Sequence, residues 1–157
     1  MPVRFLRNAS ELADVSWETP LPVQVANAKP VPADTLLVAT TTVTTDANRD
    51  LLGSTSTELP TLDGCMQYRK LVWFYFRAGA DSTTYRVLAR ATDHNGAPLG
   101  TGWQEIVPAT PLPGDANSWG RIEIPSTGDG YYDQYRIEVR RTAGSNYALT
   151  SKILGVR

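Results

Sequence analysis

The sequence has very few of the residues that build covalent cross-links and metal sites. Among 157 residues there is one Cys and one His. One Cys cannot form an intramolecular disulfide, and one Cys with one His cannot complete a Cys/His zinc site within a single chain. We therefore expect no disulfide framework, no metal centre and no cofactor.

The sequence also lacks an excess of charge of either sign, and it lacks long apolar runs. The chain carries 15 basic and 16 acidic side chains, so its net charge of -1 gives no general attraction to nucleic acid or to an anionic membrane. No apolar run approaches the roughly 20 residues that span a bilayer, and the N-terminal sequence lacks the apolar core of a secretory signal. We expect neither a nucleic-acid nor a membrane partner, and folding in a reducing cytosol.

No familiar catalytic signature occurs. The sequence contains no G-x-S-x-G, H-E-x-x-H, Walker A or G-x-G-x-x-G motif. His94 falls in a predicted tight turn, whereas a catalytic His needs an orienting partner and a pocket. Cys65 has no second His to activate it, so we interpret it as a buried or half-buried thiol. The chain is expected to be non-enzymatic.

Two acidic segments deserve comparison with cation sites. Asp46–Asp50 begins like a calcium loop, but Leu51 and Thr57 stand where that loop requires Gly and Glu. Asp129 and Asp133 lie next to glycines, in a stretch typical of a turn. We interpret both segments as polar turns rather than as cation sites.

Residues 1–35 form a proline-punctuated region that differs from the rest. Prolines fix φ and remove backbone donors, so this region cannot contain a central strand. Apolar residues alternate between prolines, which is typical of an extended arm lying along a surface, and a short helical turn is predicted at 10–14. The arm residues expected to bind a partner are Trp17, Pro20, Leu21, Pro22, Val23, Val25, Pro30, Val31 and Pro32.

Residues 36–157 predict a second region made of strands. The segments rich in β-branched or alternating apolar residues are 36–45, 69–77, 84–92, 119–125, 134–141 and 147–156. Residues 78–83 predict a hairpin, and Asn95-Gly96 predicts a type I′ turn. About seven or eight strands without a long helix indicate an all-β fold, an antiparallel β-sandwich of which the jelly roll is one form.

The strand 71–76 is apolar on both faces. Trp73 and Tyr75 lie on one face, and Val72, Phe74 and Phe76 on the other. A strand in a two-layer sandwich needs only one apolar face. Either the strand is buried centrally, or a second element covers it, such as this chain's own arm or that of another subunit.

Aromatic residues offer a second kind of binding surface. Exposed rings on a β-sandwich can stack on sugars, as in carbohydrate-binding modules, whereas Trp and Tyr are also enriched at subunit contacts. The candidates for interface or glycan contact are Trp73, Tyr75, Trp103, Trp119, Tyr131 and Tyr132.

The overall layout resembles the small accessory proteins of tailed-phage virions, most closely capsid decoration (cement) proteins. The resemblance rests on Pro20-Leu-Pro-Val-Gln-Val25 and Lys29-Pro-Val-Pro32, followed by the sandwich from Leu36 to Val156. It implies a homo-oligomer, with a trimer favoured, whose arms contact neighbours or a capsid. The expected location is the virion, assembled in the host cytoplasm.

Three functions therefore remain open from the sequence. The first is a capsid decoration protein that stabilises a phage shell through its arm and its oligomeric sandwich. The second is a tail, baseplate or fibre adaptor of the same fold. The third is a carbohydrate-binding module that would use Trp103, Trp119 and Tyr131 or Tyr132.

Overall fold

The computed structural model describes residues 3–8, 11–15, 33–79, 82–100, 102–124 and 132–157. The chain divides into two compact units, Met1–Val31 and Pro32–Arg157, so the second unit begins four residues before the predicted boundary. The first unit contains one antiparallel pair, β1 (Val3–Asn8) and β2 (Glu11–Val15). The helical turn predicted at 10–14 is therefore wrong, because backbone pairing with β1 makes this segment a strand.

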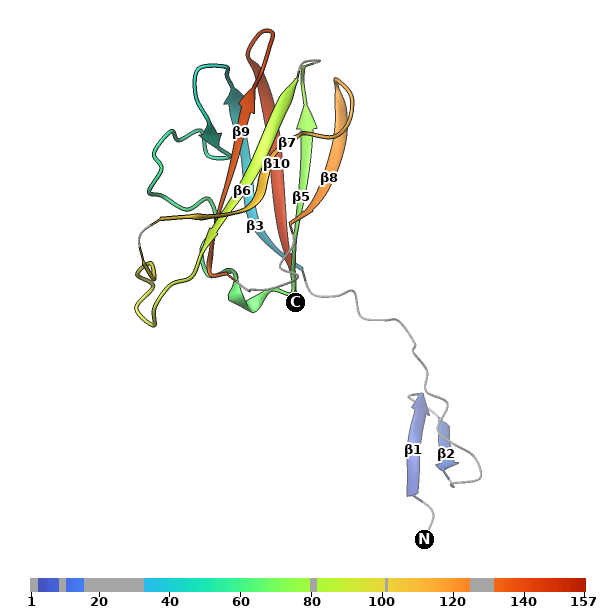
Figure 1. Cartoon of the computed structure of the whole chain (residues 1–157). Helices are drawn as coiled ribbons and strands as arrows, with labels where there is room; N and C mark the ends of the chain where they lie inside the picture. The colour runs from blue at the N-terminus through green and yellow to red at the C-terminus, as the bar shows by residue number, and fades with distance from the viewer. Residues whose placement is uncertain (1–2, 9–10, 16–32, 80–81, 101, 125–131) are drawn as a thin grey trace. The chain divides into compact units, whose positions relative to one another are not determined.

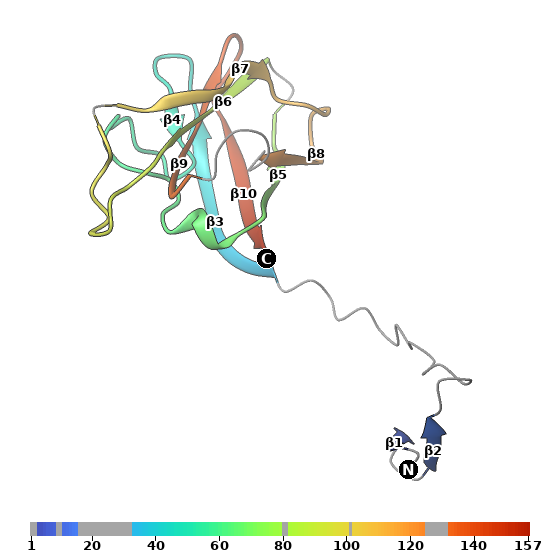
Figure 2. The same cartoon turned by 60° about the horizontal axis from the view of Figure 1, so that its bottom comes forward.

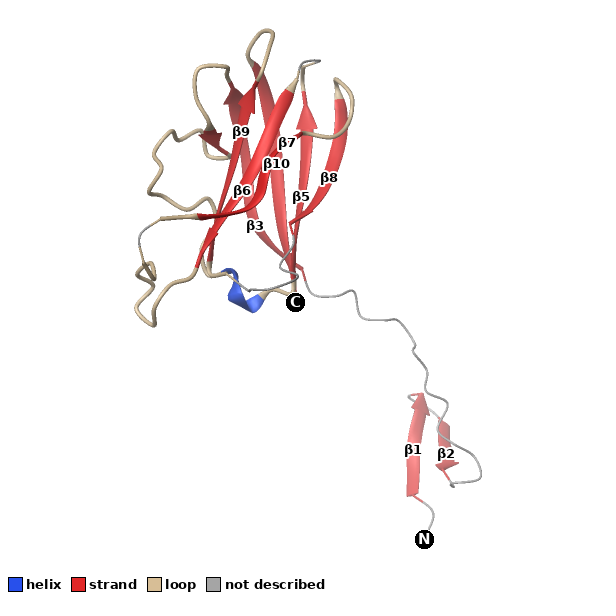
Figure 3. Ribbon diagram, in the orientation of Figure 1, coloured by secondary structure: helices blue, strands red, loops and turns tan. Residues whose placement is uncertain are grey.

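The second unit is an antiparallel β-sandwich, as the sequence predicts (Figures 1 and 3). One sheet has the order β3-β10-β5-β8 and the other β4-β9-β6-β7. The strands are β3 (Ala33–Val43), β4 (Arg49–Asp50), β5 (Lys70–Arg77), β6 (Thr83–Arg90), β7 (Gln104–Pro111), β8 (Ser118–Ile124), β9 (Gln134–Arg141) and β10 (Tyr147–Val156), with one 3-10 turn, η1 (Cys65–Gln67).

The strands pair in a nested order. Within the sandwich the first strand pairs with the last, the second with the second last, and so on inward, giving β3–β10, β4–β9, β5–β8 and β6–β7. This is the connectivity of an eight-stranded jelly roll. Figure 2 shows the two sheets as separate layers. No helix among the described residues has the length and apolar content needed to cross a membrane.

Two predicted turns differ from the structure. Residues 78–83 do not close a hairpin, because both neighbours of β5 are already taken by β10 and β8, and β6 lies in the other sheet. The Asp93–Gly96 turn is present, with Gly96 N–H donating to Asp93 O, but only Gly96 has a positive φ. A type I′ turn requires positive φ at both central residues, so the predicted turn type is wrong.

The inner faces of the two sheets form the core. Alternation along β5 turns Leu71, Trp73 and Tyr75 toward the opposite sheet, and both aromatic side chains are completely buried. Their rings lie 5.0 Å apart, and Tyr85 of the facing sheet packs edge-on against Trp73 at 5.8 Å. The expectation that Trp73 and Tyr75 could serve as surface contacts is therefore wrong, because this face of the strand fills the core.

One glycine is required by the packing of a core tyrosine. Tyr75 crosses over Gly120 of β8, where an added Cβ would lie 2.1 Å from the ring carbon Cζ. The hydroxyl of Tyr75 donates to Pro113 O at 2.7 Å, which fixes the ring in this position. Residue 120 can therefore carry no side chain without moving Tyr75.

Candidate functional site

The outer face of the β3-β10-β5-β8 sheet exposes an apolar surface. Strand pairing aligns Val38, Lys152 and Phe74 in one row, and the neighbouring rows bring together Leu154 with Val72 and Phe76 with Trp119. We call this surface the outer apolar face, defined as Val38, Phe74, Phe76, Trp119 and Leu154 around Lys152. Val72 lies on the same side of β5 but is only 5% exposed, so it is not part of this surface.

Two side chains on this face are exposed to an unusual degree for apolar residues. Val38 is 69% exposed and Trp119 is 70% exposed. The indole of Trp119 lies 5.2 Å from the ring of Phe76, so the two rings form one continuous apolar surface. A contiguous exposed apolar patch on a folded domain indicates an interaction site.

The outer apolar face is hollowed as well as apolar. A groove of about 500 Å³ crosses it from β3 to β8. Its walls include Val38, Phe74, Trp119 and Leu154, and the side chains of Thr150 and Lys152 on β10 are the polar ones beside it. A groove of this kind accepts apolar side chains from a partner and has few polar groups to satisfy.

Charged residues lie along one side of this face. Glu123 of β8 is 2.5 Å from the Lys70 ammonium and also pairs with Arg121. The hydrogen bond from Lys70, followed by the charges of Lys70 and Arg121, lowers the pKa of the Glu123 carboxyl below its ordinary value. Lys152 is exposed in the middle of the face, and its stem can cover apolar surface while its ammonium stays in water.

The outer face of the second sheet is polar and partly covered. Arg136 and Glu138 lie on this outer face of β9, and the structure buries both side chains. Segment 51–61 lies over them, and Thr61 and Leu62 N–H groups donate to Tyr135 O at 2.8 and 2.9 Å. This part of the outer face is therefore closed to water.

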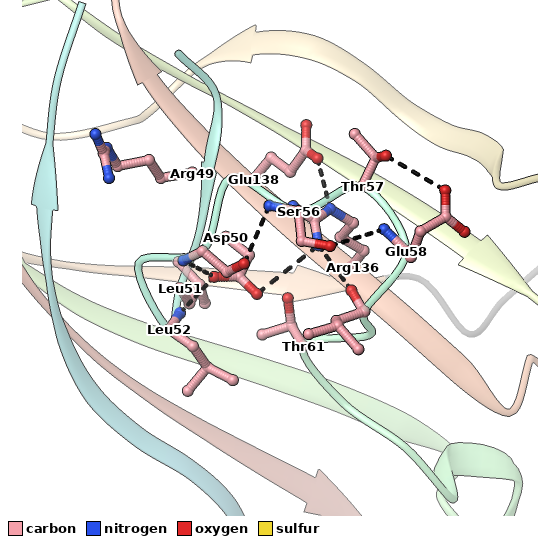
Figure 4. Close-up of polar contacts among 12 residues, drawn as sticks. Arg49, Asp50, Leu51, Leu52, Ser56, Thr57, Glu58, Thr61, Arg136 and Glu138 are labelled. Atoms are coloured by element: carbon pink, nitrogen blue, oxygen red, sulfur yellow. Dashed lines mark hydrogen bonds and ion pairs between the residues drawn. The ribbon is translucent and has the colours of Figure 1, made fainter. Parts of the chain in front are cut away.

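Beneath that segment lies a network of buried charges (Figure 4). Arg136 Nε donates to Glu138 Oε1 at 2.6 Å, and its Nη1 donates to Leu59 O at 2.7 Å and lies 3.9 Å from Asp50 Oδ2. Arg86 Nε donates to the other Glu138 oxygen at 2.6 Å. The network fixes segment 51–61 on the sheet, which is a structural role.

A second groove of about 490 Å³ lies on this polar face. Its lining includes Arg86, Glu138, Arg140 and several threonines. Its cations have partners, because Arg86 pairs with Glu138 and Arg140 donates to Thr45 O at 3.2 and 3.3 Å.

The structure does not gather the predicted surface aromatics into one platform. Trp103 donates its indole N–H to Thr57 O at 2.8 Å, and the guanidinium of Arg90 lies 4.1 Å from its ring centre. Tyr132 donates its hydroxyl to Gln104 Oε1 at 3.0 Å and packs edge-on against Tyr135. Trp119 lies on the other sheet, and Tyr131 lies outside the described residues.

The residues considered for nucleophilic or cation chemistry have structural surroundings. His94 is exposed at its turn. Cys65 is a buried free thiol, and burial, together with the nearby Asp63 and Asp133 charges, raises its pKa to about 12. Asp50 accepts from the N–H groups of Leu52 and Ser54. The described residues include no group of three or more Cys, His, Asp or Glu side chains placed to hold a metal ion.

The predicted partner-binding residues of the arm, Trp17, Pro20, Leu21, Pro22, Val23, Val25, Pro30, Val31 and Pro32, all lie outside the described residues. Their assignment remains a prediction from sequence.

The sequence indicated only part of the outer apolar face. The signal in the sequence was that strand β5 is apolar on both of its faces. Val38 and Leu154 belong to the outer apolar face because of the strand register, which a single sequence does not reveal.

Comparison with protein-family models, with curated proteins and with solved structures finds no match to this chain. Its function is therefore inferred from the geometry of the surface and from the sequence.

Proposed function

We propose that this chain is a non-enzymatic structural protein of a phage virion that binds and stabilises the capsid. The observation that carries the proposal is the outer apolar face, with Val38 and Trp119 both about 70% exposed beside a groove. Apolar surface of this extent is costly to leave in water and favours a protein partner. The resemblance of the arm and sandwich to capsid decoration proteins favours a capsid protein as that partner.

The chemistry of the face favours protein over sugar. A sugar site places an aromatic ring beside several polar groups that bind hydroxyls. Next to Trp119 the sheet instead presents Phe76, Phe74 and Leu154. Trp103 has one ring face occupied by Arg90, and it lies away from Trp119. A carbohydrate-binding module is therefore the weaker candidate.

A decoration protein would act by mass action. A ligand that binds only the assembled shell stabilises that shell in proportion to the occupancy of its sites, without chemistry. The partners are then other copies of this chain, with a trimer favoured, and a capsid protein. A tail, baseplate or fibre adaptor would use the same surfaces, and it differs only in the number of copies per particle.

Copy number on purified particles tests the proposal. Quantitative mass spectrometry of virions from the virus that encodes the chain should find hundreds of copies for a decoration protein. A ring of a few copies would assign it to a tail or baseplate instead, and absence from the particle would contradict both functions.

Deletion of the arm should abolish binding to the capsid and leave the sandwich folded. A variant lacking residues 1–32 should keep the circular dichroism spectrum and melting transition of the sandwich, because the sandwich forms its own compact unit. It should no longer protect particles against heat or chelator treatment. Protection equal to that of the full chain would contradict the anchoring role of the arm.

A glycan array tests the carbohydrate-binding alternative, with the Trp119→Ala variant as the control.

A further inference from the structure

The groove on the polar face of the second sheet has the size of a small-molecule site. Its volume of about 490 Å³ falls within the range of about 300–1,000 Å³ that is usual for such sites. A second hollow of about 310 Å³ adjoins it, since Thr84 and Thr142 line both. We call the larger hollow the polar groove, and the polar side chains that define it are Thr45, Asn48, Thr84, Arg86, Glu138 and Arg140.

Two cross-strand pairs form the floor of the polar groove. Arg86 of β6 lies opposite Glu138 of β9, and Thr84 lies opposite Arg140, so all four side chains share the outer face of the sheet. The Glu138 side chain is only 3% exposed, and both of its oxygens accept hydrogen bonds. Oε1 accepts from Arg136 and Oε2 from Arg86, each at 2.6 Å. The one carboxylate among the described lining residues is therefore already matched by cations of the sheet.

Arg140 brings to the groove a positive charge that no carboxylate balances. Its Nε and Nη2 donate to the Thr45 carbonyl at 3.3 and 3.2 Å, which holds the guanidinium in place without cancelling its charge. Among the residues that the structure describes, no acidic group lies within ion-pair distance of Arg140, and none accepts from its Nη1. The edge formed by Nη1 and Nη2 therefore remains for an oxyanion, which a guanidinium binds through two parallel hydrogen bonds.

The other polar side chains suit a ligand that carries hydroxyl groups. The Thr84 hydroxyl donates to Arg140 O at 3.4 Å, and the Thr142 hydroxyl donates to Ser82 O at 3.2 Å, so both oxygens are left as acceptors. Asn48 is half-buried in the lining and adds an amide that can both donate and accept. An oxyanion with hydroxyl groups beside it is the chemistry of a sugar acid.

We propose that the polar groove binds an acidic sugar unit, with its carboxylate on Arg140 and its hydroxyls on Thr84, Thr142 and Asn48. A free sugar acid and an acidic unit within a longer glycan share this chemistry, and the adjoining hollow has room for a further unit. The inference does not rest on the proposed function, because the polar groove and the outer apolar face belong to different sheets.

Titration of the full-length chain with galacturonate, followed by NMR chemical shifts, tests the site. Saturable shifts should appear at the amides of Thr45, Thr84, Arg140 and Thr142. Galactose has the same ring without the carboxylate, so it should bind at least about tenfold more weakly, because the charge-assisted hydrogen bonds are lost. Tighter binding of trigalacturonate than of galacturonate would identify a glycan chain as the ligand, and equal binding would identify a free sugar acid.

Arg140→Gln removes the charge and leaves the rest of the groove in place. This variant should bind galacturonate at least about tenfold more weakly than the unaltered chain. Arg121→Gln is the matched control, since the Arg121 side chain is also exposed, at 55%, but lies on the other sheet. It should bind like the unaltered chain. Absence of saturable shifts, equal affinity for galactose, or unchanged affinity in Arg140→Gln would overturn the inference. None of these results alters the copy-number test of virion function.

Discussion

At the scale of single residues, the core is organised around buried aromatic side chains with fixed neighbours. Tyr75 has no exposed surface, donates to Pro113 and crosses Gly120 at a distance that excludes a side chain there. Gly120→Ala should therefore destabilise the sandwich by about 2 kcal/mol, the cost of forcing a core side chain from its place. Chemical denaturation measures this change.

A second substitution separates the steric cause from a general effect of alanine on β8. In a Tyr75→Ala background the ring is gone, and Gly120→Ala should then cost much less than it does in the unaltered chain. Equal costs in the two backgrounds would contradict the steric explanation, because residues in contact are not expected to act additively.

At the scale of elements, segment 51–61 is held to the second sheet by ions rather than by apolar packing alone. Arg136→Met would leave Glu138 and Asp50 buried without this cation, and breaking such a buried pair costs about 3 kcal/mol. Arg140→Met, an exposed arginine of the same strand, should change stability by no more than about 0.5 kcal/mol. Hydrogen exchange in segment 51–61 should accelerate only in the first variant. Equal protection in both variants would remove the proposed role of the network.

The elements also mark the limit of what a sequence reveals. Alternation located β9 and β10 at the observed bounds, because each strand has one apolar face. Strand β7 was missed because Pro108 and Pro111 obscure the pattern, although an edge strand tolerates prolines. Burial of Arg136 could not be foreseen, since it depends on a loop that crosses the strand from 77 positions away at Leu59.

At the scale of the whole molecule, buried phenols make stability depend on alkaline pH. Burial is the main cause that raises the pKa of Tyr135, to about 12, and burial also raises the pKa of Tyr75 and Tyr85. The unfolded chain loses these protons near pH 10 while the folded chain keeps them, so stability present below pH 10 is lost as the pH rises toward 12. For Tyr135 the loss is on the order of 3 kcal/mol.

Denaturation at a series of pH values between 8 and 12 measures this dependence. Tyr135→Phe has no phenol to titrate, so its stability should fall less steeply than that of the unaltered chain above pH 10. Identical slopes would show that Tyr135 does not contribute to the alkaline transition.

The nested pairing of strands makes the sandwich suitable for circular permutation. It places Val156, near the end of the last strand, directly opposite Ala33, the beginning of the first. A short linker could therefore join residue 157 to residue 33 without crossing either sheet, and new ends could be opened at an exposed turn such as 93–97. The sandwich is in this sense a nearly closed loop of chain, and its order of strands does not depend on where that loop is cut.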